Sequence, residues 1–288
     1  RYAALTLALV LSVLTGVVMA EDAKQNDSKE GASDHPLSWT VRYAKSRSDY
    51  IRRTVQDYSC RLIKRERIDG ELQEYRFARV MVRCEQREDD EITQPMSVFM
   101  RFLAPASIRD RRVLYIDGQN SGKALVRRGG PYLSFLRVRV DPRGPAAQRE
   151  SNYPITDVGF DKIVDRLVER VQDDIKNDPT AANTEVSHFR GAKVNDRVCT
   201  HIRVVHPRKQ NGANFYRASL YIDDQLHVPI RLVVYDWPSS KGEKPPLLEE
   251  YTYVDLRLNV GLTDADFDAS RLDDNSESSA IMSTSYSE

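Results

Sequence analysis

The stretch 247–268 constrains the fold of this chain more than any other segment. Between positions 248 and 258 the side chains alternate in character, and a period of two is typical of a β-strand with two different faces. Gly261 ends the alternation, and an acidic turn that contains Phe267 follows. We expect a long strand that closes a sheet formed by the preceding chain. The face expected to be aliphatic consists of Leu248, Thr252, Val254, Leu256 and Leu258, and the opposite face of Tyr251, Tyr253, Asp255, Arg257 and Asn259.

Two amphipathic helices are predicted by apolar residues that recur at steps of three and four. The first covers about 36–56, where Pro36 suits the first helical position. The second follows Thr156, which is expected to cap it, and Pro179 stops it. The apolar stripe of the second helix contains Phe160, Ile163, Val164, Leu167, Val168, Val171 and Ile175.

Short alternating or apolar runs predict strands on both sides of the second helix. Asp69-Gly70 is a hairpin turn signal between the first two of these strands. A charged loop is expected over 85–94. A long irregular loop is expected over 131–152, which contains three prolines. The order of elements argues for one antiparallel sheet covered on one side by helices, an α+β domain over 36–272. The expected strands are 58–68, 75–84, 96–103, 113–116, 123–126, 185–189, 197–206, 215–222 and 228–236.

The first twenty residues differ from the rest of the chain. Positions 3–20 carry no charge, and Val18-Met19-Ala20 ends the run as a signal peptidase site would. We expect a signal peptide over 1–20 that is cleaved after Ala20, and a periplasmic or secreted protein. The alternative is an uncleaved N-terminal anchor, because about 18 apolar residues nearly span a bilayer. A flexible linker over 21–35 and a disordered tail over 273–288 flank the domain.

Charge and cysteine content exclude several classes of protein. The chain has 43 basic and 43 acidic residues, a balance that argues against a general nucleic-acid binder. Three cysteines exclude a disulfide-framework fold. Cys60 and Cys84 lie on the two arms of the first hairpin, and the sequence leaves open whether they form a disulfide or stay free.

The patterns of catalytic and metal sites are each incomplete. Asp264, Asp266 and Asp268 begin like a calcium loop, but Ala269 and Asn275 occupy the positions that need Gly and Glu. The histidines lack the spacing of metal ligands, and no serine lies in the G-x-S-x-G motif of hydrolases. The loop 118–123 ends in Gly-Lys like a phosphate-binding loop but lacks that loop's first glycine. We therefore expect no enzyme, no metal and no cofactor.

Two surfaces are candidates for binding. The first is an apolar strand face, which is either plain core or the wall of a cavity, and methionines suit an adaptable wall. The second helix would cover it as a lid. Its candidate ligand-binding residues are Met96, Val98, Met100, Phe102, Leu114, Ile116, Ile163, Leu167 and Val171. The second surface is basic, either a solvated sheet face or a site for an anionic partner, and consists of Arg61, Lys64, Arg65, Arg67, Arg109, Arg111 and Arg112.

An ordered set of short motifs over about 37–272 resembles the bacterial domain of unknown function 1571 family. That family is in turn similar to the periplasmic lipoprotein-carrier superfamily of LolA, LolB and RseB type, through its topology and its last strand, which ends in a Phe turn. The motifs are Tyr58-x-Cys60, Lys64-Arg65-Glu66-Arg67 with Gly70, Tyr115-x-Asp117-Gly118-Gln119-Asn120, Tyr153-Pro154-Ile155-Thr156, Tyr235-Asp236-Trp237-Pro238 and Glu249-Glu250-Tyr251-Thr252-Tyr253 through Phe267-Asp268.

The resemblance implies an antiparallel β half-barrel with helices over its concave face and no catalytic residue. It implies an exported binding protein that holds a lipid or lipoprotein acyl chain in that concavity, as a carrier or a sensor. The alternative is a cell-envelope module that binds a polyanionic polymer or a protein partner through the basic sheet face. Neither hypothesis includes a nucleic-acid partner, and neither includes a stable membrane span after the signal peptide is cleaved.

Overall fold

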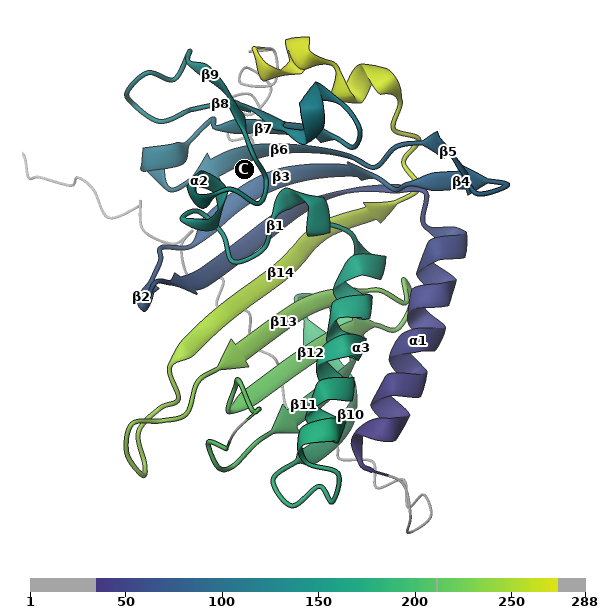
Figure 1. Cartoon of the computed structure of the whole chain (residues 1–288), viewed down its shortest axis with the longest axis vertical. Coiled ribbons are helices and arrows are strands. Elements are labelled where there is room, and N and C mark those ends of the chain that lie inside the picture. The colour runs from purple at the N-terminus through teal and green to yellow at the C-terminus, as the bar shows by residue number, and fades with distance from the viewer. Residues whose placement is uncertain (1–34, 211, 274–288) are drawn as a thin grey trace, which may run out of the picture.

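A curved antiparallel sheet forms the body of the described structure. Helices α1 (Leu37–Thr54) and α3 (Phe160–Asn177) lie side by side over its concave face (Figure 1). The computed structural model describes residues 35–210 and 212–273. The sheet stays open, with β10 and β9 as its outermost strands. The predicted α+β half-barrel with helices on the concave face is confirmed.

The strands follow the order β10-β11-β12-β13-β14-β1-β3-β6-β7-β8-β9, and β2 pairs with β1 beyond this path. A separate hairpin consists of β4 and β5. The strands are β1 (Asp57–Ile68), β2 (Glu71–Leu72), β3 (Arg76–Arg83), β4 (Gln86–Glu88), β5 (Glu91–Gln94), β6 (Ser97–Ala104), β7 (Arg112–Ile116), β8 (Ala124–Arg127), β9 (Arg137–Val140), β10 (Glu185–Val194), β11 (Arg197–Val205), β12 (Arg217–Asp223), β13 (Pro229–Tyr235) and β14 (Leu247–Leu258). Shorter helices are α2 (Pro145–Gln148), η1 (Ala106–Ile108), η2 (Asn120–Gly122), η3 (Ile155–Asp157), η4 (Asp264–Phe267) and η5 (Ala269–Leu272).

Strand β14 occupies the middle of the sheet, between β13 and β1, and so joins the two halves of the chain. The prediction of a single aliphatic face is wrong. Asp255 adopts a φ of 54°, and the register with β1 shifts between Ser59 and Arg61. One extra residue reverses the faces beyond it. As a result Tyr251 and Tyr253 pack in the same core as the later Leu256 and Leu258.

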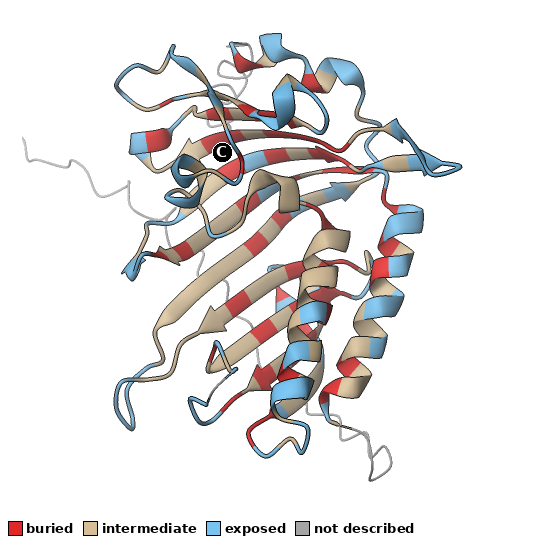
Figure 2. Ribbon diagram, viewed as in Figure 1, coloured by how far each residue is buried: buried red, intermediate tan, exposed pale blue. Residues whose placement is uncertain are grey.

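Buried residues form a main core between the helices and the concave face, and a smaller one on the convex face. Figure 2 shows that buried positions recur along the strands of both halves of the sheet. In the main core the Tyr58 and Phe160 rings lie 4.5 Å apart. The convex core contains Phe99, Phe267 and Leu272, so η4 and η5 cover that face. Phe267 is 2% exposed, as expected of an anchor in the terminal turn.

Three local predictions need correction. Helix α3 begins after Gly159, and the Thr156 hydroxyl bonds Asp157 within η3 instead of capping the helix. The expected irregular loop over 131–152 contains β9 and α2, and the expected loop over 85–94 forms the β4–β5 hairpin. These short elements were missed because they depend on pairing and docking more than on their own hydrophobic pattern.

The three cysteines are free thiols. The register places Cys60 opposite Val80, and Cys84 lies beyond the last pair of that hairpin. Within residues 35–210 and 212–273, none of the helices has the length and apolar character needed to cross a bilayer. The predicted signal peptide (1–20), linker (21–35) and tail (273–288) lie outside the described residues, apart from His35 and Asp273 at their boundaries.

Candidate functional site

A cavity of about 830 Å³ lies between the concave face of the sheet and the helices that cover it. Its sheet wall is aliphatic and includes Met100, Val113 and Val126 from adjacent strands. Its helical wall comes from the α3 stripe that contains Ile163 and Leu167. The volume falls within the range of roughly 300–1,000 Å³ that is typical of small-molecule pockets.

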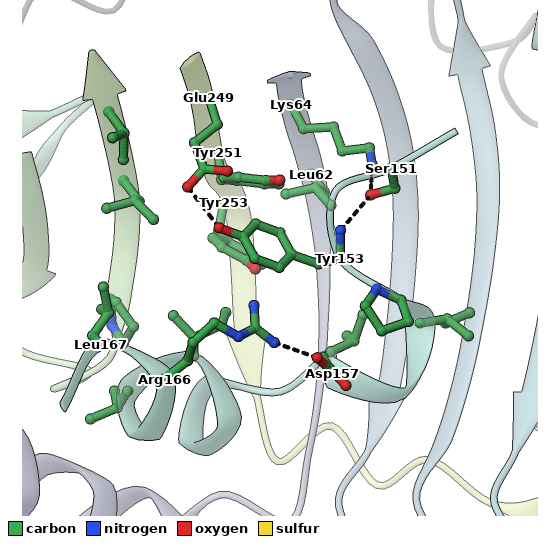
Figure 3. A pocket seen from close by; sticks show the side chains of 18 of the residues that line it. Leu62, Lys64, Ser151, Tyr153, Asp157, Arg166, Leu167, Glu249, Tyr251 and Tyr253 are labelled. Atoms are coloured by element: carbon green, nitrogen blue, oxygen red, sulfur yellow. Dashed lines mark hydrogen bonds and ion pairs between the residues drawn. The ribbon is translucent and has the colours of Figure 1, made fainter. Parts of the chain in front are cut away.

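Residues 150–157, here called the strap, run between α2 and α3 and form one side of the cavity. Polar contacts fix the strap to the sheet (Figure 3). Lys64 donates to the Ser151 hydroxyl at 2.8 Å, and the Tyr153 hydroxyl donates to Glu249 Oε1 at 2.8 Å. Arg76 also donates to the Glu150 carbonyl, at 2.6 Å. The strap is therefore anchored on three neighbouring strands, β3, β1 and β14.

Glu66 is the main acceptor in this anchor and is 2% exposed. Its carboxylate accepts from Lys64 Nζ at 2.7 Å, from the Ser151 hydroxyl at 3.0 Å and from the Asn152 amide at 3.0 Å. The Tyr251 hydroxyl donates to it as well. Burial by itself raises the pKa of Glu66, but the charge and hydrogen bonds of Lys64 and the other donors outweigh burial, so the pKa is lowered.

Glu249, which lines the cavity, has a pKa shift opposite to that of Glu66. Burial raises the pKa of Glu249, and the nearby Glu66 charge adds to the effect, while the Tyr153 hydrogen bond opposes it. Burial and Glu249 together raise the pKa of Tyr153. The Arg166 guanidinium lies 4.3 Å from the centre of the Tyr153 ring and pairs with Asp157 at 2.8 Å. The cavity thus combines long aliphatic walls with a polar end at Tyr153 and Glu249, where a ligand's head group would meet hydrogen-bonding side chains. Arg170 and Asp174 add polar groups to the lining further along α3.

The structure brings together five of the nine predicted binding residues on the cavity wall. They are Met100, Phe102, Ile163, Leu167 and Val171. Met96 and Val98 lie on the same face of the sheet but are fully covered, at 4% and 0% exposed, and belong to the main core. The sulfur of Met96 lies 3.1 Å from Lys162 Nζ.

The placement of Leu114 and Ile116 on this wall is wrong. Both lie in the convex core, because Leu114 pairs with Phe99 and therefore shares its face of the sheet. The cavity receives their neighbour Val113, which pairs with Met100. A shift of one residue in register moves every side chain of a strand to the other face.

The sequence prediction missed the tyrosines and acid of β14 that form the polar end of the cavity. Tyr251 and Tyr253 were assigned to the face opposite the aliphatic one, and Glu249, which shares their spacing of two, was assigned to neither face. Because they are two positions apart, these three side chains share one face of the strand. Only the pairing of β14 with its neighbours shows that this face points toward the cavity.

The predicted basic set does not form one surface. Lys64 faces the cavity, whereas Arg112 is 1% exposed on the opposite face and pairs with Asp110. On that convex face the strand register places six arginines side by side. Carboxylates interrupt the row, because Asp110, Asp255 and Asp273 each pair with at least one of its members. The row consists of Arg61, Arg79, Arg101, Arg112, Arg127 and Arg137.

The acidic side chains of the turn after β14 cap two short helices. Thr263 and Asp266 form a capping box at the start of η4, and Asp268 caps η5 by accepting from the Ser270 amide at 2.8 Å. Among the residues that the structure describes, no three His, Cys, Asp or Glu side chains are grouped as metal ligands.

Comparison with protein families agrees with the family resemblance that the sequence motifs indicate. The profile of a family described as "Protein of unknown function (DUF1571)" matches residues 55–276. No curated protein sequence matches the chain. Among solved structures, a LolA superfamily protein from Nitrosomonas europaea is 11% identical, with 80% of this chain and 98% of that chain covered and a TM-score of 0.35.

Two further solved structures are similar at comparable levels. A DUF1329 family protein from Desulfovibrio piger is 17% identical, with 83% of this chain and 100% of that chain covered and a TM-score of 0.39. MucB in the MucA/MucB complex of Pseudomonas aeruginosa is 13% identical, with 82% of this chain and 62% of that chain covered and a TM-score of 0.45.

Proposed function

We propose that this chain, which belongs to the DUF1571 family of proteins of unknown function, is a non-catalytic binding protein that holds an apolar ligand beneath α1 and α3. The observation that carries the proposal is the cavity of about 830 Å³. A space of this size with aliphatic walls is unfavourable when filled with water, and an apolar ligand relieves that cost.

The ligand we propose is an acyl chain of a lipid or lipoprotein. The walls supply Met100, Val126 and Leu167, side chains without hydrogen-bonding groups along a cavity that crosses several strands. A flexible chain of methylene groups matches such a wall because each buried methylene contributes about 0.8 kcal/mol without requiring a fixed partner. The polar end beside Tyr153 and Glu249 would receive the ester, amide or head-group atoms.

A catalytic role is disfavoured by the chemistry of the cavity's polar residues. Glu66 and Glu249 are engaged in holding the strap, and burial raises the pKa of Tyr153 and Tyr251. Burial also raises the pKa of the Cys84 and Cys199 thiols to about 12, so the nucleophilic thiolate is rare at neutral pH. These features support a binding role for the polar residues around the cavity.

Export to the periplasm or cell surface is part of the proposal, with residues 36–272 acting as one domain. We expect the exported protein to begin at Glu21, because the uncharged run 3–20 ends in Val18-Met19-Ala20. Intact-mass spectrometry of protein recovered from the periplasmic fraction checks this. A protein found in the membrane fraction with residues 1–20 still attached would establish an anchor instead.

The Met100→Glu variant tests whether the cavity holds an acyl chain. Met100 lines the cavity, so a carboxylate there should prevent an acyl chain from lying against the wall while remaining hydrated itself. We expect displacement assays with a fluorescent fatty acid to show loss of binding, and the free energy of unfolding to fall by about 1 kcal/mol or less.

Ile92→Glu is the matched control, because Ile92 is 49% exposed on β5 and away from the cavity wall. It should bind the fluorescent fatty acid as the parent protein does. A parent protein that binds no apolar probe, together with a Met100→Glu variant that unfolds, would show that this face is packed core and would end the proposal.

A further inference from the structure

The turn between β8 and β9 exposes an unusual group of apolar side chains. We call residues 131–136 the aromatic tip. Tyr132 is 83% exposed and Phe135 is 73% exposed. In the part of the chain that the structure describes, eight large hydrophobic side chains are exposed, and four of them lie within this tip. Scattered exposed hydrophobic residues are ordinary, but a contiguous group on one turn indicates an interaction site. The four are Tyr132, Leu133, Phe135 and Leu136.

The base of the tip is fixed by backbone contacts. The Gly130 amide donates to the Arg109 carbonyl at 2.7 Å, and the Arg128 amide donates to the Leu136 carbonyl at 3.1 Å. Gly129 and Gly130 have φ of 64° and 78°, and a Cβ at Gly129 would lie 2.1 Å from the Arg111 amide nitrogen. The chain therefore needs glycine here, and the closely packed base holds the four apolar side chains away from the core.

Positive charge surrounds the aromatic tip. The segment 127–149 contains six arginines and one aspartate, whereas the whole chain is balanced. Arg128 and Arg139 are exposed on either side of the tip, and Arg109 is exposed next to its base. An apolar tip within a cationic collar complements an anionic surface that has an apolar interior, which describes the interface of a bilayer with anionic lipids.

The same hairpin also forms part of the cavity wall. Val126 of β8 and Val138 and Val140 of β9 line the cavity. The tip connects the end of β8 to the start of β9 and extends beyond these two strands (Figure 1). A bilayer at the tip would therefore lie next to the strands that form the cavity.

We propose that the aromatic tip docks this protein onto the surface of an anionic lipid bilayer. Tyr132 and Phe135 enter the interfacial region, where aromatic rings are favoured, and the exposed Arg128 and Arg139 contact the lipid phosphates. The inference does not require an acyl chain in the cavity. If both proposals hold, docking places the cavity wall where lipid chains are available.

Vesicle co-sedimentation tests the inference. The protein is used as cells produce it, with the same termini in every variant, so that any contribution of residues 1–34 cancels. The probes are vesicles of phosphatidylcholine alone and of phosphatidylcholine with phosphatidylglycerol. We expect binding to the anionic vesicles, with an affinity that falls as salt increases because exposed charges are screened.

Two variants separate the apolar and cationic parts of the tip. Tyr132→Ser and Phe135→Ser should each weaken binding to anionic vesicles roughly tenfold, because each removes an aromatic side chain that enters the interface. Ile92→Ser should leave binding unchanged, because Ile92 is exposed on a different hairpin. Arg139→Glu should weaken binding only to the anionic vesicles, and Arg53→Glu on the exposed face of α1 is its control.

Three results would overturn the inference. They are a parent protein without preference for anionic vesicles, serine variants that bind vesicles as the parent does, and serine variants that only abolish self-association in sedimentation velocity. The last would assign the tip to a second copy of the chain. Binding of the fluorescent fatty acid by the Phe135→Ser variant is measured in solution in parallel. If the variant still binds the fatty acid, a failure of docking is separate from a failure of the cavity proposal.

Discussion

Replacing Asp110 with alanine is expected to lower the free energy of unfolding by about 2–3 kcal/mol, less than the roughly 3–5 kcal/mol for breaking a fully buried ion pair, because the Asp110 side chain is 29% exposed. The Asp110 carboxylate accepts from Arg101 Nε at 2.8 Å, from Arg112 Nη2 at 3.0 Å and from Arg127 Nη1 at 2.8 Å. Arg112 is 1% exposed and Arg101 is 7% exposed, so water replaces the lost carboxylate only in part.

The surrounding row makes this loss larger than that of a single ion pair of the same exposure. Arg101 pairs across the strands with Arg79 on one side and Arg112 on the other, and Arg112 pairs with Arg127. Like charges directly opposite each other destabilise a sheet. Asp110 reduces that repulsion at the centre of the row, and its removal leaves adjacent guanidinium groups without this shared acceptor.

Urea unfolding measures the effect, and Asp89→Ala is the matched control. Asp89 has a φ of 46° and Asp110 a φ of 63°, so both substitutions place alanine in the left-handed backbone region. The control therefore includes the backbone strain without the arginine contacts. Asp110→Asn isolates the charge, since it keeps the shape of the side chain. An equal loss in Asp110→Ala and Asp89→Ala would contradict the role given to the arginine row.

The contribution of Asp110 should depend on pH. Burial raises the pKa of Asp110, but the hydrogen bonds and charges of Arg112, Arg127 and Arg101 outweigh burial, so the pKa lies below its ordinary value. A lowered pKa in the folded state contributes stability that is present above the unfolded value of about 3.9 and is lost as pH falls through the folded value. We expect the stability difference between parent and Asp110→Asn to be constant near neutral pH and to shrink in acid.

Replacing Glu66 with alanine is the second change with a large expected effect. It removes the acceptor of four donors and leaves Lys64, whose side chain is 12% exposed, without its carboxylate. We expect the free energy of unfolding to fall by about 3–5 kcal/mol. Because Ser151 and Asn152 lose their partner, the strap should also detach from β1.

Hydrogen exchange distinguishes detachment of the strap from a general loss of stability. The Asn152 amide, which donates to Glu66, should exchange faster than the global loss of stability alone predicts. Glu249→Gln is the control at the same end of the cavity. Its amide oxygen can still accept from Tyr153, and the substitution removes a charge that burial disfavours, since burial raises the pKa of Glu249. A Glu66→Ala variant with parental stability and parental Asn152 exchange would show that the strap is held by other contacts.

The sequence alone determined the two long helices, the longer strands and much of the fold class. The stripe of Ile163, Leu167 and Val171 predicts an amphipathic helix whose apolar side must be covered, and α3 turns this side toward the cavity. Asp69-Gly70 predicts the turn after β1, and both residues have positive φ there. These features depend on neighbours within a few residues, which is why local periodicity and turn chemistry were sufficient to identify them.

Tertiary structure decided which side of each strand meets the cavity. Leu114 and Val113 are both apolar, and only the pairing of β7 with β6 turns Val113 toward the cavity. The bulge at Asp255 likewise places Tyr251 and Leu256 in one core although they are five positions apart. The physical reason is that a strand's alternation fixes which residues share a face, whereas long-range register and bulges fix where that face points. The strap, the aromatic tip and the arginine row all depend on such distant pairings, so the chain's local pattern could not reveal them.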